Sequence, residues 1–264
     1  MRNFDDIMYT YLAPDNEPAP YVNGIILVGL NEKGHTKMKR RIGLRKALLT
    51  LAIICCCALP AYAAIKFLTP SQVAAETGKS AVAQAFESED AIAVNETQCF
   101  KDYNVTFLGL VSGKTLGDKN ILRNGEFESD RTYFVTAIEK ADGGGFEDLE
   151  TSPSFCVSPF IKGYRPALVN VMTLKGHYEE ILENGVIYRI MDCTNIECFA
   201  DTTVYLGVTE GLLPQWSAYI QDGTTGIISR NQQFDGLNAL FEIPLDKTKA
   251  DPVLAAGKIN TIMQ

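Results

Sequence analysis

The chain has few of the residues that usually carry enzymatic chemistry. Its 264 residues include two histidines, His35 and His177, and a single tryptophan, Trp216. The sequence also lacks a G-x-S-x-G nucleophile elbow, a P-loop, a G-x-G-x-x-G dinucleotide fingerprint and an H-E-x-x-H zinc motif. We therefore predict no catalytic residue, no metal-ligand set and no bound cofactor, and we expect that the protein is not an enzyme.

Two patterns of ionisable residues remain as weaker alternatives. Carboxylates cluster within residues 147–150 and within residues 179–183. Paired carboxylates catalyse glycoside hydrolysis when they are held about 5–9 Å apart, but acidic runs are more often solvated faces. His177 could join Cys193 and Cys198 around a zinc ion, although one histidine and two cysteines match a zinc site only weakly.

Acidic and basic residues are divided unevenly along the chain. Residues 1–46 carry 8 basic and 5 acidic side chains, whereas residues 66–264 carry 16 basic and 27 acidic ones. The second part therefore has a net charge of −11. A surface of this sign does not bind nucleic acid by neutralising phosphates, so we exclude a nucleic-acid partner.

The chain contains only one long hydrophobic run. Residues 47–65 (ALLTLAIICCCALPAYAAI) contain no charged side chain. As a helix this segment would span roughly 28 Å, which is close to the thickness of the hydrocarbon core of a bilayer. We predict that residues 47–65 form a transmembrane helix and that the protein spans the membrane once.

Basic residues predict the orientation of this helix. Within about 20 residues after the apolar run, the only basic residues are Lys66 and Lys79. Lysine and arginine are enriched on the cytoplasmic side of a transmembrane helix. The flank before the run contains a basic cluster made of Lys37, Lys39, Arg40, Arg41, Arg45 and Lys46. We therefore expect the protein in the cell membrane, with a cytoplasmic N-terminus and an extracytoplasmic C-terminal domain.

A cleaved signal peptide is the alternative interpretation of the apolar run. Ala61-Tyr62-Ala63 fits the small-x-small pattern at which signal peptidase cuts, so the chain could be cleaved after Ala63. A signal peptide normally starts close to the N-terminus, however, and 46 residues precede this run. The sequence therefore favours an uncleaved anchor.

The cytoplasmic tail, residues 1–46, contains an apolar segment that the tail is too small to bury. It reads YVNGIILVGL over residues 21–30 and follows a proline-rich stretch. Such a segment folds on a partner, lies on the membrane surface or stays disordered. As residues for binding a partner in the cytoplasm we predict Val22, Ile25, Ile26 and Leu27.

Residues 66–90 are expected to form a juxtamembrane pair of helices. Thr69 and Pro70 make a helix start, because a hydroxyl residue suits the N-cap and proline suits the first helical position. The first helix would cover residues 71–77 and end at Gly78. The second would cover residues 79–87 (KSAVAQAFE).

From residue 91 onward the sequence is typical of β-structure. Segments rich in valine, isoleucine, threonine, tyrosine and phenylalanine predict strands at residues 92–98, 105–111, 132–139, 155–161, 169–174, 186–191, 204–208 and 239–243. Asn184-Gly185 predicts a hairpin between residues 178–182 and 186–191. The expected fold class is mainly β, with residues 91–264 forming an extracytoplasmic β-sandwich that is Ig-like in general architecture.

Cysteines and the tryptophan supply two further predictions for this domain. Cys193 and Cys198 are close in sequence and form the easiest possible disulfide, while free thiols remain equally compatible with the sequence. Trp216 lies in an apolar stretch, GLLPQWSAY. If exposed, this stretch is a partner-binding patch; if buried, it is a loop folded over the sandwich.

Several segments along the chain resemble a group of bacterial membrane proteins. They include FDDIM (residues 4–8), KMKRR (37–41), AYAAIKFLTPSQVA (61–74), FLGLVSGK (107–114), DRTYFVTAIEKADG (130–143), VSPFIKG (157–163), FADTTVYLGVTEG (199–211) and GLNALFEIPLDKTKADP (236–252). In these segments and in their order the chain resembles single-pass, anti-sigma-factor-like proteins of clostridial-type Gram-positive bacteria, whose extracytoplasmic domain has no known function. The resemblance implies a tail that holds a sigma factor or another regulator, and an outside domain that senses a ligand.

Three functions follow as expectations. The first is a signalling protein, in which the outside domain senses or binds an unknown ligand and the tail captures a cytoplasmic partner such as a sigma factor. The second is a membrane-anchored surface interaction or structural module with no signalling role. The third is an enzyme, kept only because a β-sandwich can carry many chemistries.

Overall fold

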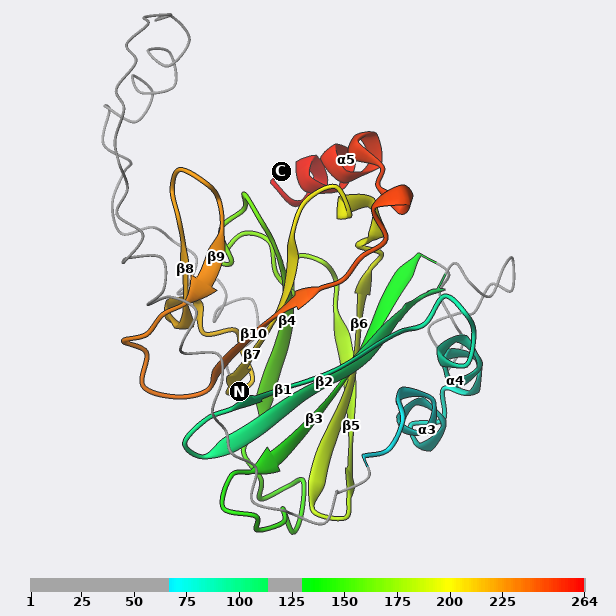
Figure 1. The fold of residues 1–264 in the computed structure, drawn as a ribbon, viewed down its shortest axis with the longest axis vertical. Helices are drawn as coiled ribbons and strands as arrows, with labels where there is room; N and C mark the ends of the chain where they lie inside the picture. The colour runs from blue at the N-terminus through cyan, green and yellow to red at the C-terminus, as the bar shows by residue number, and fades with distance from the viewer. Residues whose placement is uncertain (1–66, 114–129, 264) are drawn as a thin grey trace, which may run out of the picture. The chain divides into compact units, whose positions relative to one another are not determined.

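The structure is a computed structural model that describes residues 67–113 and 130–263 (Figure 1). The predicted tail, the predicted transmembrane helix over residues 47–65 and the alternative cleavage site at Ala63 lie outside the described residues. Among the helices that are described, none is both long enough and apolar enough to span a membrane.

The described chain is mainly β, with antiparallel sheets and three α-helices (Figure 1). A five-stranded sheet has the order β1-β2-β3-β6-β5, a three-stranded sheet has the order β10-β7-β4, and β8 and β9 form a short hairpin. The strands are β1 Ile92–Cys99, β2 Tyr103–Ser112, β3 Arg131–Lys140, β4 Phe155–Ile161, β5 His177–Glu183, β6 Val186–Thr194, β7 Val204–Glu210, β8 Tyr219–Gln221, β9 Ile228–Arg230 and β10 Asn238–Ile243.

The predicted hairpin is confirmed. β5 and β6 pair antiparallel, with Glu183 opposite Val186 across the two-residue turn. Asn184 and Gly185 have φ angles of 52° and 77°. Positive φ at both central residues is the requirement of a type I′ turn, and asparagine and glycine adopt it at least cost.

The main hydrophobic core lies between the two larger sheets. Strand residues alternate between faces, so every second side chain of β3, β6 and β7 points into this core, as Phe134, Met191 and Leu206 do. In β2 the alternation reverses after Phe107, because a bulge shifts the register between Phe107 and Gly109. A Cβ at Gly109 would lie 2.5 Å from the carbonyl oxygen of Ile92, so only glycine permits β1 to approach here.

Helices α3 (Pro70–Glu76) and α4 (Ser80–Phe86) cover the outer face of the five-stranded sheet (Figure 1). This confirms the predicted helix pair to within a residue at each end. Thr69 and Gln72 form a reciprocal capping box, and Pro70 occupies the first turn. The apolar side of the pair packs on outward-facing residues of the sheet, including Leu108, Val135 and Tyr188.

Two parts of the fold differ from expectation. The predicted strand at residues 169–174 is wrong, because this segment forms turns. Asn170 sits at their centre: its Oδ1 accepts from Met172 N at 2.9 Å and its Nδ2 donates to Pro166 O at 3.0 Å. These local bonds replace a strand ladder. Helix α5 (Pro252–Ile262) is also absent from the expected elements, although Asp251 caps it and Pro252 occupies its first turn; its Ala255 and Ile259 pack on the main core.

Candidate functional site

An apolar surface surrounds the only tryptophan. It is made of side chains on the β7–β8 connection and the β8–β9 hairpin, and we call it the Trp216 surface. Their exposed fractions are Leu212 67%, Leu213 51%, Trp216 36%, Ile220 51% and Ile227 44%. Within the predicted stretch, Leu212, Leu213 and Trp216 are therefore exposed, whereas Pro214, Ala218 and Tyr219 are buried, and a role of the stretch in binding stays a prediction.

The Trp216 surface is held by a buried layer beneath it. Tyr219 packs edge-on against Phe160 of β4, with 4.9 Å between ring centroids, and its hydroxyl donates to Ala239 O at 2.9 Å. Burial raises the pKa of the Tyr219 hydroxyl well above its usual value. Because strand residues alternate, Ile220 next to Tyr219 points outward. The hairpin is thus fixed to the three-stranded sheet, with its apolar side chains facing solvent.

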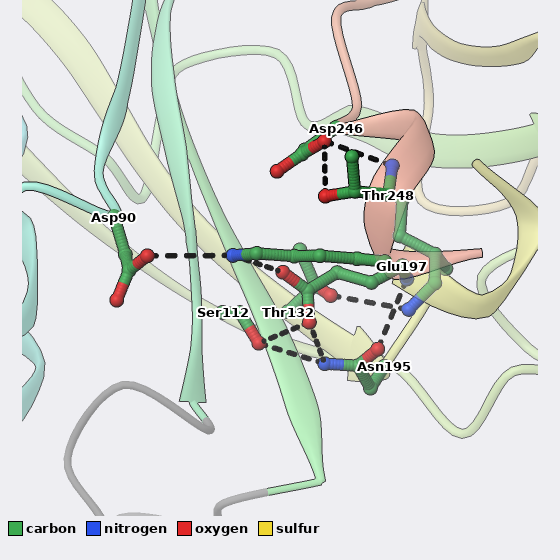
Figure 2. A network of polar contacts seen from close by, with 9 residues as sticks. Asp90, Ser112, Thr132, Asn195, Glu197, Asp246 and Thr248 are labelled. Carbon is green, nitrogen blue, oxygen red and sulfur yellow. Dashed lines mark hydrogen bonds and ion pairs between the residues drawn. The ribbon is translucent and has the colours of Figure 1, made fainter. Parts of the chain in front are cut away.

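A buried carboxylate forms the centre of a polar network (Figure 2). Glu197 Oε2 accepts from Ser112 Oγ at 2.9 Å and from Asn195 Nδ2 at 3.3 Å. Its other oxygen, Oε1, accepts from Lys249 Nζ at 3.0 Å, and the same ammonium lies 3.4 Å from Asp90 Oδ1. Burial lowers the pKa of Lys249, but the hydrogen bond and charge of Glu197, with the charge of Asp90, outweigh it and raise the pKa.

This network joins segments that are far apart in the sequence. Asp90 precedes β1, Ser112 ends β2, Glu197 opens a short 3₁₀ helix after β6, and Lys249 ends another before α5. None of these four residues was expected from the sequence to belong to a site, because no local pattern marks them. Lys249 neutralises the buried Glu197 carboxylate and connects the segment before α5 to the β-sheet domain. This is a structural role.

His177 lies beside a second ion pair. Arg131 Nε donates to Asp192 Oδ1 at 2.7 Å, and Arg131 Nη2 also contacts Asp192 and lies 3.1 Å from His177 Nδ1. Cys193 instead points into the core between the sheets. The structure does not bring the three suggested zinc ligands together, and no group of three or more such side chains exists within residues 67–113 and 130–263.

The two cysteines suggested as a disulfide are both buried thiols in the structure. Cys193 Sγ donates to Thr194 O at 3.3 Å, and Cys198 Sγ lies 3.9 Å from Asn195 O. The disulfide between them is therefore not formed here and stays a prediction. Burial raises the pKa of the Cys193 thiol far above its usual range, and it raises that of Cys156 to about 11.

The two carboxylate clusters noted in the sequence meet in one groove. The groove has a volume of about 440 Å³, and we call it the acidic groove. It is lined by Glu76, Glu147, Asp148, Leu149, Glu180, Ile181, Leu182 and Glu183. Glu150 does not line it, and Glu179 turns away to pair with Lys79 at 2.5 Å.

A buried arginine lies next to this groove. Arg189 Nη2 donates to Glu180 Oε1 at 2.6 Å, and the guanidinium carbon lies 3.8 Å from the centroid of the Tyr178 ring. The Arg189 side chain is 3% exposed. Glu180 thus compensates a buried charge, while the other carboxylates of the groove face solvent.

Comparison with protein-family models, with curated proteins and with solved structures finds no match for this chain.

Proposed function

We propose that the chain is a single-pass membrane sensor. In this proposal residues 47–65 anchor it, residues 67–263 form an extracytoplasmic binding domain of Ig-like β-sandwich architecture, and residues 1–46 hold a cytoplasmic regulator such as a sigma factor. The observation that carries the proposal is the short distance along the chain between anchor and domain. The apolar run ends at Ile65, and Phe67 already packs against the folded domain.

The packing at this junction involves both ring and main-chain contacts. Phe67 meets the Tyr188 ring edge-on, with 6.5 Å between centroids, and Leu68 N donates to the Tyr188 hydroxyl at 3.1 Å. The capping box at Thr69 then fixes the start of α3. A module that only displays a binding surface gains reach from a flexible linker. A domain that packs directly after its anchor is better suited to transmit a change to it.

The Trp216 surface is the binding face that we assign to this sensor. It lies on the outer side of the three-stranded sheet, whereas α3 and α4 cover the outer side of the five-stranded sheet. Ligand binding would reach the helices through the core that the two sheets share. An exposed tryptophan with exposed apolar neighbours is suited to contact a protein partner.

The test is to lengthen the junction. A flexible Gly/Ser segment of about ten residues is inserted between Lys66 and Phe67 in the full chain, and the same segment is inserted in the exposed β1–β2 turn, between Lys101 and Asp102, as a control. The readout in the source organism is recovery of a sigma factor with the tail. We expect the junction insertion to change this recovery and the control insertion to leave it unchanged.

Two results would contradict the signalling role, and a third would contradict the anchor. Recovery of no sigma factor with the wild-type tail, or recovery unaffected by Ile25→Asp and Ile26→Asp, would remove the signalling role. The alternative, a membrane-anchored surface module, would then be favoured if deletion of residues 1–32 left the function intact. A mature chain that begins at Ala64 and is free of lipid would contradict the anchor itself.

A further inference from the structure

Strand β5 forms one free edge of the five-stranded sheet. It pairs with β6 on one side, and no main-chain hydrogen bond reaches residues 177–183 from any other described segment. Because Glu183 and Val186 flank a type I′ turn, they form a hydrogen-bonded pair, and alternate residues of β5 turn their N–H and C=O groups outward. Those outward-directed residues are Tyr178, Glu180 and Leu182.

The other edges of the two larger sheets are protected. At the opposite edge, β1 has a bulge between Ala93 and Glu96, and the Gln98 side chain bonds both main-chain groups of Leu240 in β10, at 2.8 and 3.1 Å. β4 contains Pro159, which has no N–H to offer. Free edges invite pairing with another chain, so the contrast marks β5 as the edge open to a partner strand.

The charges around β5 determine which partner fits. Of the five carboxylates that line the acidic groove, Glu180 is neutralised by Arg189. The remaining four, on Glu76, Glu147, Asp148 and Glu183, lie within ion-pair distance of no basic side chain among the described residues. Among residues 67–113 and 130–263, no lysine, arginine or histidine lines the groove.

This charge pattern disfavours pairing between two copies of β5. Edge-to-edge pairing of identical strands would bring the glutamates of HYEEILE against each other, and like charges on paired strands are destabilising. A neutral strand would gain nothing from the carboxylates. A strand with lysine or arginine side chains would gain both main-chain hydrogen bonds and ion pairs.

We propose that the free edge of β5 binds an extended, lysine- or arginine-rich segment of a partner protein by β-strand addition. The main chain of the segment pairs with Tyr178, Glu180 and Leu182, and its cationic side chains contact the carboxylates of the acidic groove. This inference is independent of the membrane anchor and of the Trp216 surface, since it rests on β5 and the groove alone.

The first experiment separates strand pairing from simple charge attraction. The full chain in detergent micelles is titrated with a fluorescein-labelled peptide of about ten residues in which lysine and valine alternate, and fluorescence anisotropy is measured. A second peptide has the same sequence and charge but is N-methylated along its backbone. We expect the methylated peptide to bind at least roughly tenfold more weakly, because it offers no N–H groups to β5.

The second experiment identifies the site. Glu147→Gln with Asp148→Asn removes two carboxylates of the groove, and Glu210→Gln with Asp235→Asn removes two exposed carboxylates elsewhere. We expect the groove variant to weaken binding roughly tenfold and the control variant to change it less than about twofold. The thermal stability of every variant is measured as well, so that a loss of folding is distinguished from a loss of binding.

Three outcomes would overturn the proposal. Equal binding of both peptides would show that charge alone attracts the ligand. Equal loss in both variants would place the site elsewhere. Failure of the unmethylated peptide to bind the folded wild-type chain would leave the β5 edge without the partner proposed for it.

Discussion

Lys249 and Glu197 form an ion pair of 3.0 Å that joins the C-terminal part of the chain to the short 3₁₀ helix after β6. Glu197 is buried, and Lys249 also reaches Asp90 in the connection between α4 and β1 (Figure 2). Through Asp90 and Glu197, the side chain of Lys249 therefore connects the segment before α5 to the α4–β1 connection and to the segment after β6. Its removal tests how strongly these parts depend on each other.

We predict that Lys249→Met destabilises the fold by about 1 kcal/mol, because Glu197 loses its charged donor while Ser112 and Asn195 continue to donate to it. Lys247→Met is the matched control, since no ion pair of Lys247 is present among the described residues, and it should change stability by less than about 0.5 kcal/mol. Urea unfolding of both variants measures the difference. Equal stabilities would contradict a stabilising role of the network.

The pair formed by buried Arg189 and partly buried Glu180 gives a larger predicted effect. Arg189→Met leaves the Glu180 carboxylate without its partner, and we expect a loss of about 3 kcal/mol in the free energy of unfolding. Replacing both residues, with Arg189→Met and Glu180→Leu together, should recover most of this loss, because no unpaired charge remains. Thermal unfolding of the single and double variants distinguishes the two cases. A double variant as unstable as the single one would mean that packing on Tyr178, rather than charge, is decisive.

The thiols provide a prediction on reactivity. Since burial raises the pKa of Cys156 to about 11, its thiolate fraction at pH 8 is about one in a thousand in the folded state. Maleimide labelling at pH 8, read by peptide mass spectrometry, should therefore modify exposed Cys99 well before Cys156 and Cys193. Non-reducing peptide analysis tests the predicted Cys193–Cys198 disulfide, because both residues are buried thiols in the structure. A mass loss of two hydrogens across their peptides would establish the disulfide instead.

Local interactions explain why much of the fold was predictable from the sequence. The Asn184-Gly185 turn and the Thr69–Pro70 helix start are set by residues next to each other, and both are confirmed. The segment at residues 169–174 has the composition of a strand, but side-chain bonds of Asn170 favour turns there. β8 and β9 are too short to give a periodic pattern.

The interactions at the sites depend on long-range contacts, and for that reason the sequence did not reveal them. Glu197 and Lys249 are separated by 52 positions, and their pairing depends on how α5 packs. The sequence did show the two carboxylate clusters that meet in the acidic groove. Their meeting follows from the approach of the β3–β4 connection to the β5–β6 turn, which no local pattern encodes. Exposure of Trp216 was likewise one of two open alternatives.

That approach depends on Gly185, which gives the final prediction. A Cβ at Gly185 would lie 2.6 Å from Gly145 Cα, and Phe146 N donates to Gly185 O at 2.9 Å. Gly185→Ala therefore adds a backbone clash to the strain of a positive φ, and we expect a destabilisation of about 2–3 kcal/mol. Gly143→Ala is the matched control: its φ is also positive, at 80°, but no atom lies within 4 Å of the added Cβ. The control should cost about 1 kcal/mol, which is the strain alone. Equal losses in urea unfolding would mean that the loop at Gly145 moves away freely, and the acidic groove would then not be held in place by the β5–β6 turn.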